Sequence, residues 1–441
     1  MTYANAVAFL ERLADYERLT GYRYDTKTFG PDRMKALLER IGRPQDGYPC
    51  LVVVGTKGKG STAAMLASIL DVAAPPVGLY TSPHLASWTE RIRIGGADVT
   101  EEEFAALAAA VAGPVAALEA EGSDRVPTTF EVLTAMALVG FARRGVKAAV
   151  LEAGMGGRLD AVNAVDAAGV VFTSVSLDHM DQLGSTVEAI AAEKAGVIRV
   201  PQPVTCAPQA PGVQAVIDAA CREAGAPPTL VGREVAEASP ARCDVSGCRF
   251  DARTPRGIIR DLAVPLVGRH QVVNALVAVG AAMNVPLAVS DDSIRQGLAS
   301  VRWPGRLQLL RPGLLVDGAH NGASAEALAA AIREFWGSRP RRGLIFAQLK
   351  GKDHAAVARA LVPLANRIWC PALAHARAVA PAELVAIVRE AGGQAETCGD
   401  VAGALAAARR DFGEDGDLVL VSGSLALVGE VMLACSAAWR P

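Results

Sequence analysis

Residues 51–70, LVVVGTKGKGSTAAMLASIL, constrain the fold more than any other stretch of the chain. An apolar run ends in a glycine-rich turn and then becomes an Ala-, Met- and Leu-rich pattern, which predicts a strand, a phosphate-binding loop and a helix. Gly58 and Gly60 let the backbone approach a ligand closely, while the start of the helix offers free N–H groups to phosphate oxygens. Lys59 adds positive charge. A plain strand-to-helix turn is the alternative, but it does not explain why the lysine, the glycines and two hydroxyls coincide.

The polar side chains of this loop predict a nucleotide site with a metal. Lys57 is a second positive charge beside the phosphates, and Ser61 and Thr62 are candidate hydroxyl ligands for a Mg²⁺ that bridges the terminal phosphates. The spacing differs from the commonest loop of this kind, because Gly60 stands between Lys59 and the first hydroxyl. The predicted ATP-binding residues of the loop are Lys57, Gly58, Lys59, Gly60, Ser61 and Thr62.

Two further predicted strands end in residues suited to the same site. An apolar run ends at Glu152 and is followed by a glycine-rich turn, as in the magnesium-holding acidic strand of phosphate-loop enzymes. The strand predicted over 77–81 runs directly into Ser82. Residues at the carboxyl ends of parallel strands line the ligand crevice of an open α/β sheet. The alternatives are a solvated surface glutamate and an ordinary Ser-Pro turn.

A third predicted strand, in GVVFTSVSLDHMDQLG, leads to Asp178, His179 and Asp181. A histidine flanked by two aspartates at a strand end favours a metal or phosphate role about as well as a structural one. The helix predicted over 185–198 carries Lys194 back toward the same edge of the sheet.

The composition is typical of a globular enzyme. A chain of 441 residues predicts two domains or more, and a net charge of −2 gives no sign of nucleic-acid binding. Of the eight cysteines only Cys243 and Cys248 lie close together, without the second pair of a zinc site, so we expect reduced thiols. The charged N-terminus is wrong for a signal peptide, and uncharged stretches such as 271–290 are interrupted by polar residues and proline. We expect a cytoplasmic protein without a membrane span.

Alternating strands and helices continue to the C-terminus. Helices are predicted over 3–19, 31–42, 101–120, 131–144, 323–335 and 401–411, and C-terminal strands over 314–318, 343–348, 367–372 and 418–423. The predicted fold class is α/β: an N-terminal phosphate-loop ATPase domain, 1–300, with a mostly parallel sheet, and a smaller C-terminal doubly wound, Rossmann-like domain, 304–441. The segment SVRWPGR, 300–306, is the predicted hinge. It places Arg306 where domain closure would bring it to the phosphates; a solvated linker arginine is the alternative.

The order of motifs resembles one known family. The chain resembles folylpolyglutamate synthase and dihydrofolate synthase, within the Mur ligase superfamily, over nearly its whole length. The motifs that carry the resemblance are GTKGKGST (55–62), TSPHL (81–85), ERIRI (90–94), LEAGMGGRLDAVN (151–163), LDHMDQLG (177–184), EKAGVI (193–198), GRHQVVNA (268–275), PGR (304–306) and DGAHN (317–321). Lys57 departs from the Asn usual in the family, and Gly322 from the Pro.

The resemblance implies a role for each matching residue. It implies that Ser82 and Glu152 bind one Mg²⁺, that His179 binds a second, and that Lys194 is carbamylated and binds metal. It implies that Asn274, Arg306 and Asp317 hold ATP from the far side, and that His320 and Ser424 lie near the incoming glutamate. It places Thr129, Phe130, Glu131, Leu159, Asp160 and Ala161 beside the pterin-bearing substrate. The implied catalytic residues are Lys59, Glu152, His179, Lys194, Arg306 and Asp317.

The implied reaction is ATP-dependent addition of L-glutamate to the carboxylate of a reduced folate through an acyl phosphate, with dihydropteroate left open as a second acceptor. We expect a monomer that needs ATP and two Mg²⁺ ions and has no nucleic-acid or membrane partner. One alternative is a Mur-type ligase acting on a UDP-linked cell-wall precursor, which is disfavoured because the phosphate loop begins by residue 55. The other is a non-catalytic phosphate-loop binding protein, which would not need the 177–184 motif or Lys194.

Overall fold

The computed structural model describes residues 1–17, 24–25, 29–339, 341–412 and 417–437. A sheet of eight strands, in the order β4-β3-β2-β5-β1-β6-β7-β8, forms the centre of the N-terminal part. Its strands are β1 (Cys50–Val54), β2 (Val77–Tyr80), β3 (Ile92–Ile94), β4 (Ala97–Asp98), β5 (Ala148–Glu152), β6 (Gly169–Phe172), β7 (Val204–Cys206) and β8 (Pro228–Leu230). The sheet is parallel except at the β3 and β4 edge, so the mostly parallel sheet is confirmed.

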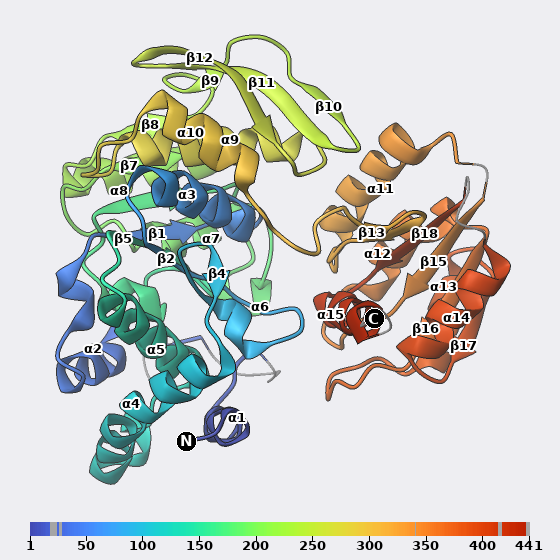
Figure 1. Cartoon of the computed structure of the whole chain (residues 1–441), viewed down its shortest axis with the longest axis horizontal. Coiled ribbons are helices and arrows are strands. Elements are labelled where there is room, and N and C mark those ends of the chain that lie inside the picture. The colour runs from blue at the N-terminus through green and yellow to red at the C-terminus, as the bar shows by residue number, and fades with distance from the viewer. Residues whose placement is uncertain (18–23, 26–28, 340, 413–416, 438–441) are drawn as a thin grey trace.

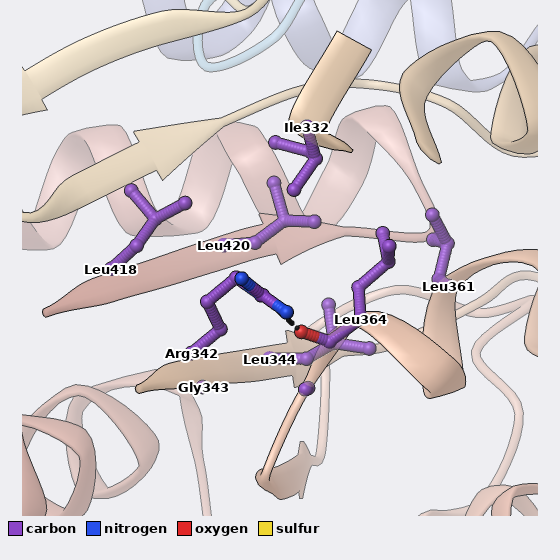
Figure 2. Close-up of a pocket in the computed structure, with 9 residues that line it drawn as sticks. Ile332, Arg342, Gly343, Leu344, Leu361, Leu364, Leu418 and Leu420 are labelled. Carbon is purple, nitrogen blue, oxygen red and sulfur yellow. Dashed lines mark hydrogen bonds between the residues drawn. The ribbon is translucent and has the colours of Figure 1, made fainter. Parts of the chain in front are cut away.

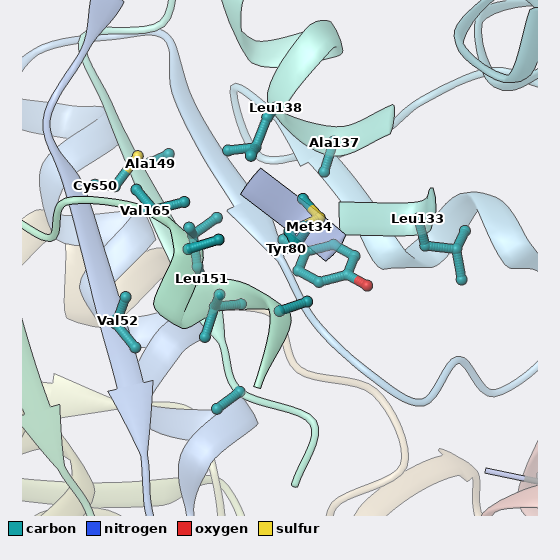
Figure 3. Packing of buried hydrophobic residues seen from close by; sticks show 14 of the residues in the cluster. Met34, Cys50, Val52, Tyr80, Leu133, Ala137, Leu138, Ala149, Leu151 and Val165 are labelled. Atoms are coloured by element: carbon teal, nitrogen blue, oxygen red, sulfur yellow. The ribbon is translucent and has the colours of Figure 1, made fainter. Parts of the chain in front are cut away.

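Helices cover both faces of this sheet. They are α1 (Tyr3–Glu11), α2 (Pro31–Arg40), α3 (Lys59–Ala73), α4 (Glu101–Glu121), α5 (Thr129–Arg143), α6 (Met180–Leu183), α7 (Val187–Ala195), α8 (Pro211–Ala224), α9 (His270–Met283) and α10 (Asp291–Ser300). Every residue of β1 is buried, because side chains alternate between two covered faces. Val52 points into the core shared with α4 and α5, part of which Figure 3 shows, while Val53 points into the core shared with α3 and α9.

Helix α4 is the one helix in the described part of the chain that is long and apolar enough, by length and composition, to cross a membrane. Its apolar side chains Phe104, Val111, Val115 and Leu118 are fully buried against the rest of the N-terminal part. A helix that buries one face in a core passes the same test, so this observation is weak evidence for a membrane.

A separate antiparallel sheet, which is absent from the predicted elements, follows β8. It consists of β9 (Ala236–Glu237), β10 (Arg242–Asp244), β11 (Gly247–Thr254) and β12 (Gly257–Val264). The expectation of reduced thiols is wrong for one pair, because Cys243 and Cys248 form a disulfide. Antiparallel pairing of β10 with β11 places these two residues directly opposite each other, with a Cα–Cα distance of 4.1 Å. The other six cysteines are free.

The C-terminal part is built on a six-stranded sheet in the order β13-β14-β18-β15-β16-β17. Its strands are β13 (Gln308–Arg311), β14 (Leu314–Val316), β15 (Arg342–Phe346), β16 (Arg367–Pro371), β17 (Ala395–Cys398) and β18 (Leu418–Ser422). Its helices are α11 (Gly322–Trp336), α12 (His354–Leu361), α13 (Pro381–Glu390), α14 (Val401–Asp411) and α15 (Leu425–Ala437). The parallel pairing typical of a doubly wound sheet stops at one edge, where β13 and β14 form an antiparallel hairpin at Gly313.

A small gap lies between the β15 and β18 strands of this part and the helices that cover them (Figure 2). Its lining is almost entirely apolar and includes Leu344, Leu361 and Leu420. Arg342 also borders it, but the guanidinium is already used, because Nε donates to the carbonyl oxygen of Leu364 over 2.7 Å. This gap is a packing feature of the C-terminal core and carries none of the predicted site residues.

Several predicted boundaries are corrected by local capping. The helix predicted over 3–19 ends at Glu11, and the helix predicted over 31–42 ends at Arg40. The helix predicted from 131 starts earlier, because Thr128 and Glu131 form a capping box at its N-terminus. The helix predicted over 185–198 is shorter, and the C-terminal strands end earlier than predicted. These changes place three predicted site residues differently: Thr129 and Phe130 lie in the first turn of α5, and Asp317 follows β14 instead of belonging to it.

The two parts meet at a loop that follows β2. Leu85 in this loop packs against the C-terminal core, and its carbonyl oxygen lies so close to Gly429 of α15 that a Cβ atom there would be only 1.9 Å away. Figure 1 shows α15 on the side of the C-terminal part that faces the N-terminal part. A second contact comes from Arg377, whose Nη1 donates to the carbonyl oxygen of Glu17 over 2.8 Å. These contacts join the two parts along the side where the site residues lie.

Candidate active site

The phosphate loop has the backbone conformation that its glycines predict. Gly58 has a φ of 84°, in the left-handed region, and α3 begins at the next residue, Lys59. A Cβ atom on Gly58 would lie 2.4 Å from Oδ1 of Asn274, so this α9 side chain lies directly against the loop. Ser61 and Thr62 are buried in the first turn of α3, and Oγ1 of Thr62 has no hydrogen-bond partner among the described residues.

Glu152 lies at the carboxyl end of β5, beside the loop. Its Oε2 accepts the backbone N–H of Ser82 over 3.3 Å and lies 3.4 Å from the position of a Cβ atom on Gly60. Burial raises the pKa of Glu152 to about 7, although the positive charges of Lys59 and Arg306 act in the opposite direction. No ion pair neutralises this carboxylate within the described residues, so its environment suits a bound cation.

His179 and Lys194 approach the loop from the next elements of the chain. Lys194 is buried on α7, and burial together with the charge of Lys59 lowers its pKa to about 7. His179 precedes α6 in a left-handed conformation, with a φ of 50°. The residue as a whole is exposed, but its ring is partly desolvated by the surrounding protein. This desolvation lowers the pKa of His179 to about 4, and the charges of Lys352, Lys59 and Lys194 lower it further. The two predicted metal ligands thus share one electrostatic environment.

The glycine turn after β5 allows α7 to pack directly against the backbone of that turn. A Cβ atom on Gly157 would lie 2.9 Å from Cα of Lys194, and one on Gly156 would lie 2.2 Å from the hydroxyl oxygen of Tyr24. That hydroxyl donates to Glu193, the neighbour of Lys194, over 3.2 Å. A side chain at Gly157 would therefore push α7 away from this turn, and one at Gly156 would displace Tyr24.

Arg306 and Asp317 come from the C-terminal part. Asp317 accepts the backbone N–H groups of Leu307, over 2.9 Å, and Ala319, over 2.8 Å. Burial raises the pKa of Asp317, while the Arg306 guanidinium acts to lower it. Nη1 of Arg306 lies 2.6 Å from the position of a Cβ atom on Gly318, so the DGAHN turn supports the guanidinium. The positive charge of Arg306 also acts on Glu152 of the N-terminal part, where it lowers the pKa against the effect of burial.

His320 and Ser424 lie at neighbouring turns of the same sheet. Nδ1 of His320 lies 2.9 Å from the carbonyl oxygen of Gly318, and burial lowers the pKa of His320 to about 4, with Lys352 adding to the effect. The backbone N–H of Gly423 donates to Ala319 over 3.1 Å, which brings Ser424 next to the turn. The Ser424 hydroxyl accepts from the backbone N–H of Leu427 at the start of α15.

Lys352 was not singled out from the sequence. It follows β15 in the segment GKDH and lies opposite Asp178 of the N-terminal part. Burial alone would raise the pKa of Asp178, but His179, Lys352 and His320 lower it overall. The available signal was the position of Lys352 shortly after a predicted C-terminal strand. Lys57 likewise interacts with carboxylates of both parts. Burial lowers its pKa, while Asp178 of the N-terminal part and Glu326 of α11 act to raise it.

The predicted folate-side residues divide into two groups, of which the first is used in helix packing. Thr129 donates through Oγ1 to the carbonyl oxygen of Leu10 over 3.1 Å. Glu131 forms an ion pair with Arg33 at 2.8 Å and accepts the backbone N–H of Thr128. Both side chains therefore hold α5 against α1 and α2, and the structure does not bring them to the phosphate loop.

The second group surrounds the glycine turn after β5. The Phe130 ring lies 2.9 Å from the position of a Cβ atom on Gly154, and its centroid is 5.7 Å from that of Tyr80. Asp160 accepts the backbone N–H groups of Met155 and Val162, each over 3.0 Å, and burial raises its pKa to about 6. The flanking residues Leu159 and Ala161 are buried.

Comparison with known proteins agrees with this arrangement. Residues 53–282 match the Mur ligase middle domain, and residues 305–425 match the Mur ligase glutamate ligase domain. The dihydrofolate synthase/folylpolyglutamate synthase of Bacillus subtilis is 35% identical over 353 residues, covering 77% of this chain and 80% of the relative. The chain belongs to the folylpolyglutamate synthase and dihydrofolate synthase family of Mur ligases. The "Probable bifunctional folylpolyglutamate synthase/dihydropteroate synthase" of Halobacterium salinarum is 36% identical over 434 residues, and this Mur ligase chain spans about half, 51%, of its length.

Solved structures of Mur ligases in this family share the whole architecture. Folylpolyglutamate synthase of Mycobacterium tuberculosis complexed with ADP has a TM-score of 0.88 and 30% identity, covering 100% of this chain and 98% of that one. FolC of E. coli, in complex with DHPP and ADP, has a TM-score of 0.85 and 31% identity, covering 99% of this chain and 98% of that one. The prediction of the family and of its α/β fold is confirmed.

Proposed function

We propose that this chain is an ATP-dependent ligase that adds L-glutamate to the carboxylate of a reduced folate, and that it also accepts dihydropteroate. The names of its relatives support both acceptors. The observation that carries the proposal is that Glu152 lies against Gly60 of the phosphate loop, where the charges of both Lys59 and Arg306 act on it. Such an arrangement suits the transfer of a phosphoryl group between two anions.

The chemistry explains why positive charge is needed there. A carboxylate is a poor acyl donor because its leaving group would be oxide. Transfer of the γ-phosphate of ATP converts the carboxylate to an acyl phosphate and releases ADP. The amine of glutamate then attacks the carbonyl carbon, loses a proton and displaces inorganic phosphate. Lys59 and Arg306 offset the repulsion between the carboxylate and the γ-phosphate and stabilise the charge that spreads during transfer. Asn274 would support the nucleotide side of the loop.

A magnesium ion fits the residues around Glu152. The carboxylate is buried without an ion pair among the described residues, Ser82 is adjacent to it, and Oγ1 of Thr62 is buried without a partner. Glu152 with Ser82 would hold the first ion, and Thr62 or Ser61 would offer the loop hydroxyl. When bound, Mg²⁺ neutralises phosphate charge. The described residues contain no cluster of three or more His, Cys, Asp or Glu, so a second ion would need a ligand of another kind.

Lys194 would supply that ligand as a carbamate. Its pKa of about 7 leaves much of the amine neutral near neutral pH. A neutral amine adds to CO₂ and releases a proton, which forms a carbamate and reverses the sign of the side chain. The carbamate of Lys194 and the neutral ring of His179 would then hold a second Mg²⁺. The lowered pKa of His179 suits this role, since a metal-binding imidazole must be unprotonated.

The remaining predicted residues would bind the two other substrates. His320 and Ser424 would face the incoming glutamate, and the second folate-side group, Phe130, Leu159, Asp160 and Ala161, would lie beside the pterin. Thr129 and Glu131 would act there only by fixing α5. We further propose that residues 1–300 and 304–441 act as two domains in a cytoplasmic monomer, without a nucleic-acid or membrane partner.

One assay tests the proposed function. ADP release should require glutamate together with tetrahydrofolate or dihydropteroate, and the product should be the acceptor plus one glutamate by mass spectrometry. A matched reaction would contain a UDP-linked cell-wall precursor with glutamate, and we expect no ADP above background there. Product formation only with the UDP-linked precursor would overturn the proposal in favour of a Mur-type cell-wall ligase. Nucleotide binding without turnover in every combination would favour a non-catalytic phosphate-loop protein.

A further inference from the structure

The indole of Trp303 fills the space over the phosphate loop. Trp303 belongs to the segment that connects α10 with β13. A Cβ atom on Gly60 would lie 2.5 Å from Cζ2 and 3.2 Å from Cε2 of Trp303, and 3.4 Å from Oε2 of Glu152. Because real Cβ atoms do not approach other atoms this closely, the ring can take this position only over a glycine. The connecting segment therefore contacts the loop backbone beside the buried carboxylate.

The ring of Trp303 also contacts a cation. The guanidinium carbon of Arg93, on β3, lies 5.3 Å from the ring centroid, within the range of cation–π attraction. An ion pair with Asp98 fixes Arg93 in turn. Nε1 of Trp303 is buried and has no hydrogen-bond partner among the described residues. The ring is thus held by packing and by the cation–π contact. Replacing Trp303 by phenylalanine would break no hydrogen bond of the side chain.

Only two residues separate Trp303 from Arg306. The first, Pro304, has a φ fixed by its ring. The second, Gly305, has a φ of 73°, and a Cβ atom there would lie 3.1 Å from Leu85 and 3.3 Å from Val428. The chain is thus confined at Trp303 by the N-terminal part and at Gly305 by both parts. If the indole moved away from Gly60, the backbone of Arg306 would therefore have to move with it.

We propose that Trp303 is a positioning residue that couples the phosphate loop to Arg306, so that the guanidinium reaches the transferring phosphate only when the indole packs on Gly60. The coupling rests on the proposed function only in the role given to Arg306. Arg93 contributes by holding the ring through the cation–π contact. No substrate contact is assigned to Trp303 itself.

Two substitutions test the role of the ring. Trp303→Ala should lower turnover by about tenfold or more while ADP affinity, measured by calorimetry without folate, changes by less than about threefold. Trp303→Phe should retain more turnover than Trp303→Ala, because an aromatic ring still fills part of the space and keeps a face for the cation–π contact with Arg93. Trp336→Phe, in the C-terminal core at the end of α11, is the matched control and should keep the wild-type ratio of turnover to affinity. Equal turnover in Trp303→Ala and wild type would overturn the proposal.

A double-mutant cycle with Gly60 separates coupling from general damage. Gly60→Ala should lower turnover, because the new methyl group collides with the indole. The double variant, which combines Gly60→Ala with Trp303→Phe, should turn over at least about tenfold faster than Gly60→Ala alone. Gly113→Ala is the control, since nothing lies within 4 Å of its Cβ position. A double variant no better than Gly60→Ala would contradict the coupling.

A readout that does not depend on the acceptor keeps this test distinct from that of the proposed function. Because the indole touches the loop, ADP should change the intrinsic tryptophan fluorescence of wild type, and Trp303→Phe should remove that change while Trp336→Phe retains it. If no folate is turned over, this comparison still decides whether Trp303 responds to the loop. An ADP response that persists in Trp303→Phe would overturn the proposal even in an active ligase.

Discussion

The backbone N–H of Ser82 donates to Oε2 of Glu152 over 3.3 Å, although Ser82 follows β2 and Glu152 is the last residue of β5. β2 and β5 are parallel neighbours, so their carboxyl ends meet at one edge. This hydrogen bond lowers the pKa of Glu152, but burial outweighs it. The carboxyl group is thus held in place for a ligand that favours its ionised form.

Glu152→Gln should remove ligase activity without unfolding the protein. The substitution keeps the volume of the side chain and its ability to accept from Ser82 but removes the charge that would bind the first Mg²⁺. We expect turnover to fall by at least about a hundredfold while the melting temperature stays within a few degrees of wild type. Steady-state kinetics and calorimetry would measure the two effects. A large loss of stability with residual activity would instead assign Glu152 a structural role.

The stability of the ligand-free protein should depend on the ionisation of Glu152. Its pKa is raised from 4.5 to about 7, so the folded protein binds this proton more tightly than the unfolded chain does. The resulting stabilisation is fully present below the unfolded pKa and is lost as the pH rises through the folded one. As the pH rises from 4.5 to about 7, the free energy of unfolding of wild type should therefore fall relative to that of Glu152→Gln. Denaturant titrations across that range would show parallel curves if Glu152 does not titrate there.

Lys194→Arg should be almost inactive, because a guanidinium cannot form a carbamate and would repel a nearby metal ion. Lys194→Ala should also be almost inactive but partly rescued by a small carboxylate such as acetate. Activity of wild type should fall when CO₂ and bicarbonate are rigorously removed, and it should return on their addition. Mass spectrometry under native conditions can detect the added carboxyl group. Full activity of Lys194→Arg would exclude the carbamate.

Arg306→Ala should lower turnover by about a hundredfold and weaken ATP binding by much less, since its charge is assigned to the transfer step. Arg302→Ala, an exposed arginine in the same connecting segment, provides a matched control that should leave both quantities near wild type. Rapid-quench measurement of ADP formation would isolate the transfer step. If ATP affinity fell in proportion to turnover, Arg306 would belong to ground-state binding.

Nucleotide should favour closure of the two parts, because Lys59 lies before the connecting segment and Arg306 and Asp317 lie beyond it. We expect the radius of gyration in solution scattering to decrease when Mg²⁺, a non-hydrolysable ATP analogue and a folate are added together. The same additions to a Lys59→Ala variant are the control and should have a smaller effect. Identical profiles for wild type in all ligand combinations would argue against closure.

The sequence alone determined the local elements of the site. The apolar strand, the glycine turn and the helix of residues 51–70 follow from patterns short enough to read directly, and β1 and α3 occur where predicted. Glu152 and Lys194 lie on the elements expected for them, at the end of β5 and on α7. The order of motifs identified the family, because these motifs are spread over nearly the whole chain.

Contacts between distant segments were decided only by the tertiary structure. The disulfide of Cys243 with Cys248 depends on a hairpin that the sequence analysis did not predict, and the packing of Glu131 on Arg33 depends on how α5 meets α2. Lys352 becomes a candidate only because the C-terminal sheet places it opposite Asp178. Local patterns specify strands and helices, but the field at a buried group is the sum over neighbours far away in the chain. For that reason the sequence could name Glu152, while only the fold shows which charges surround it.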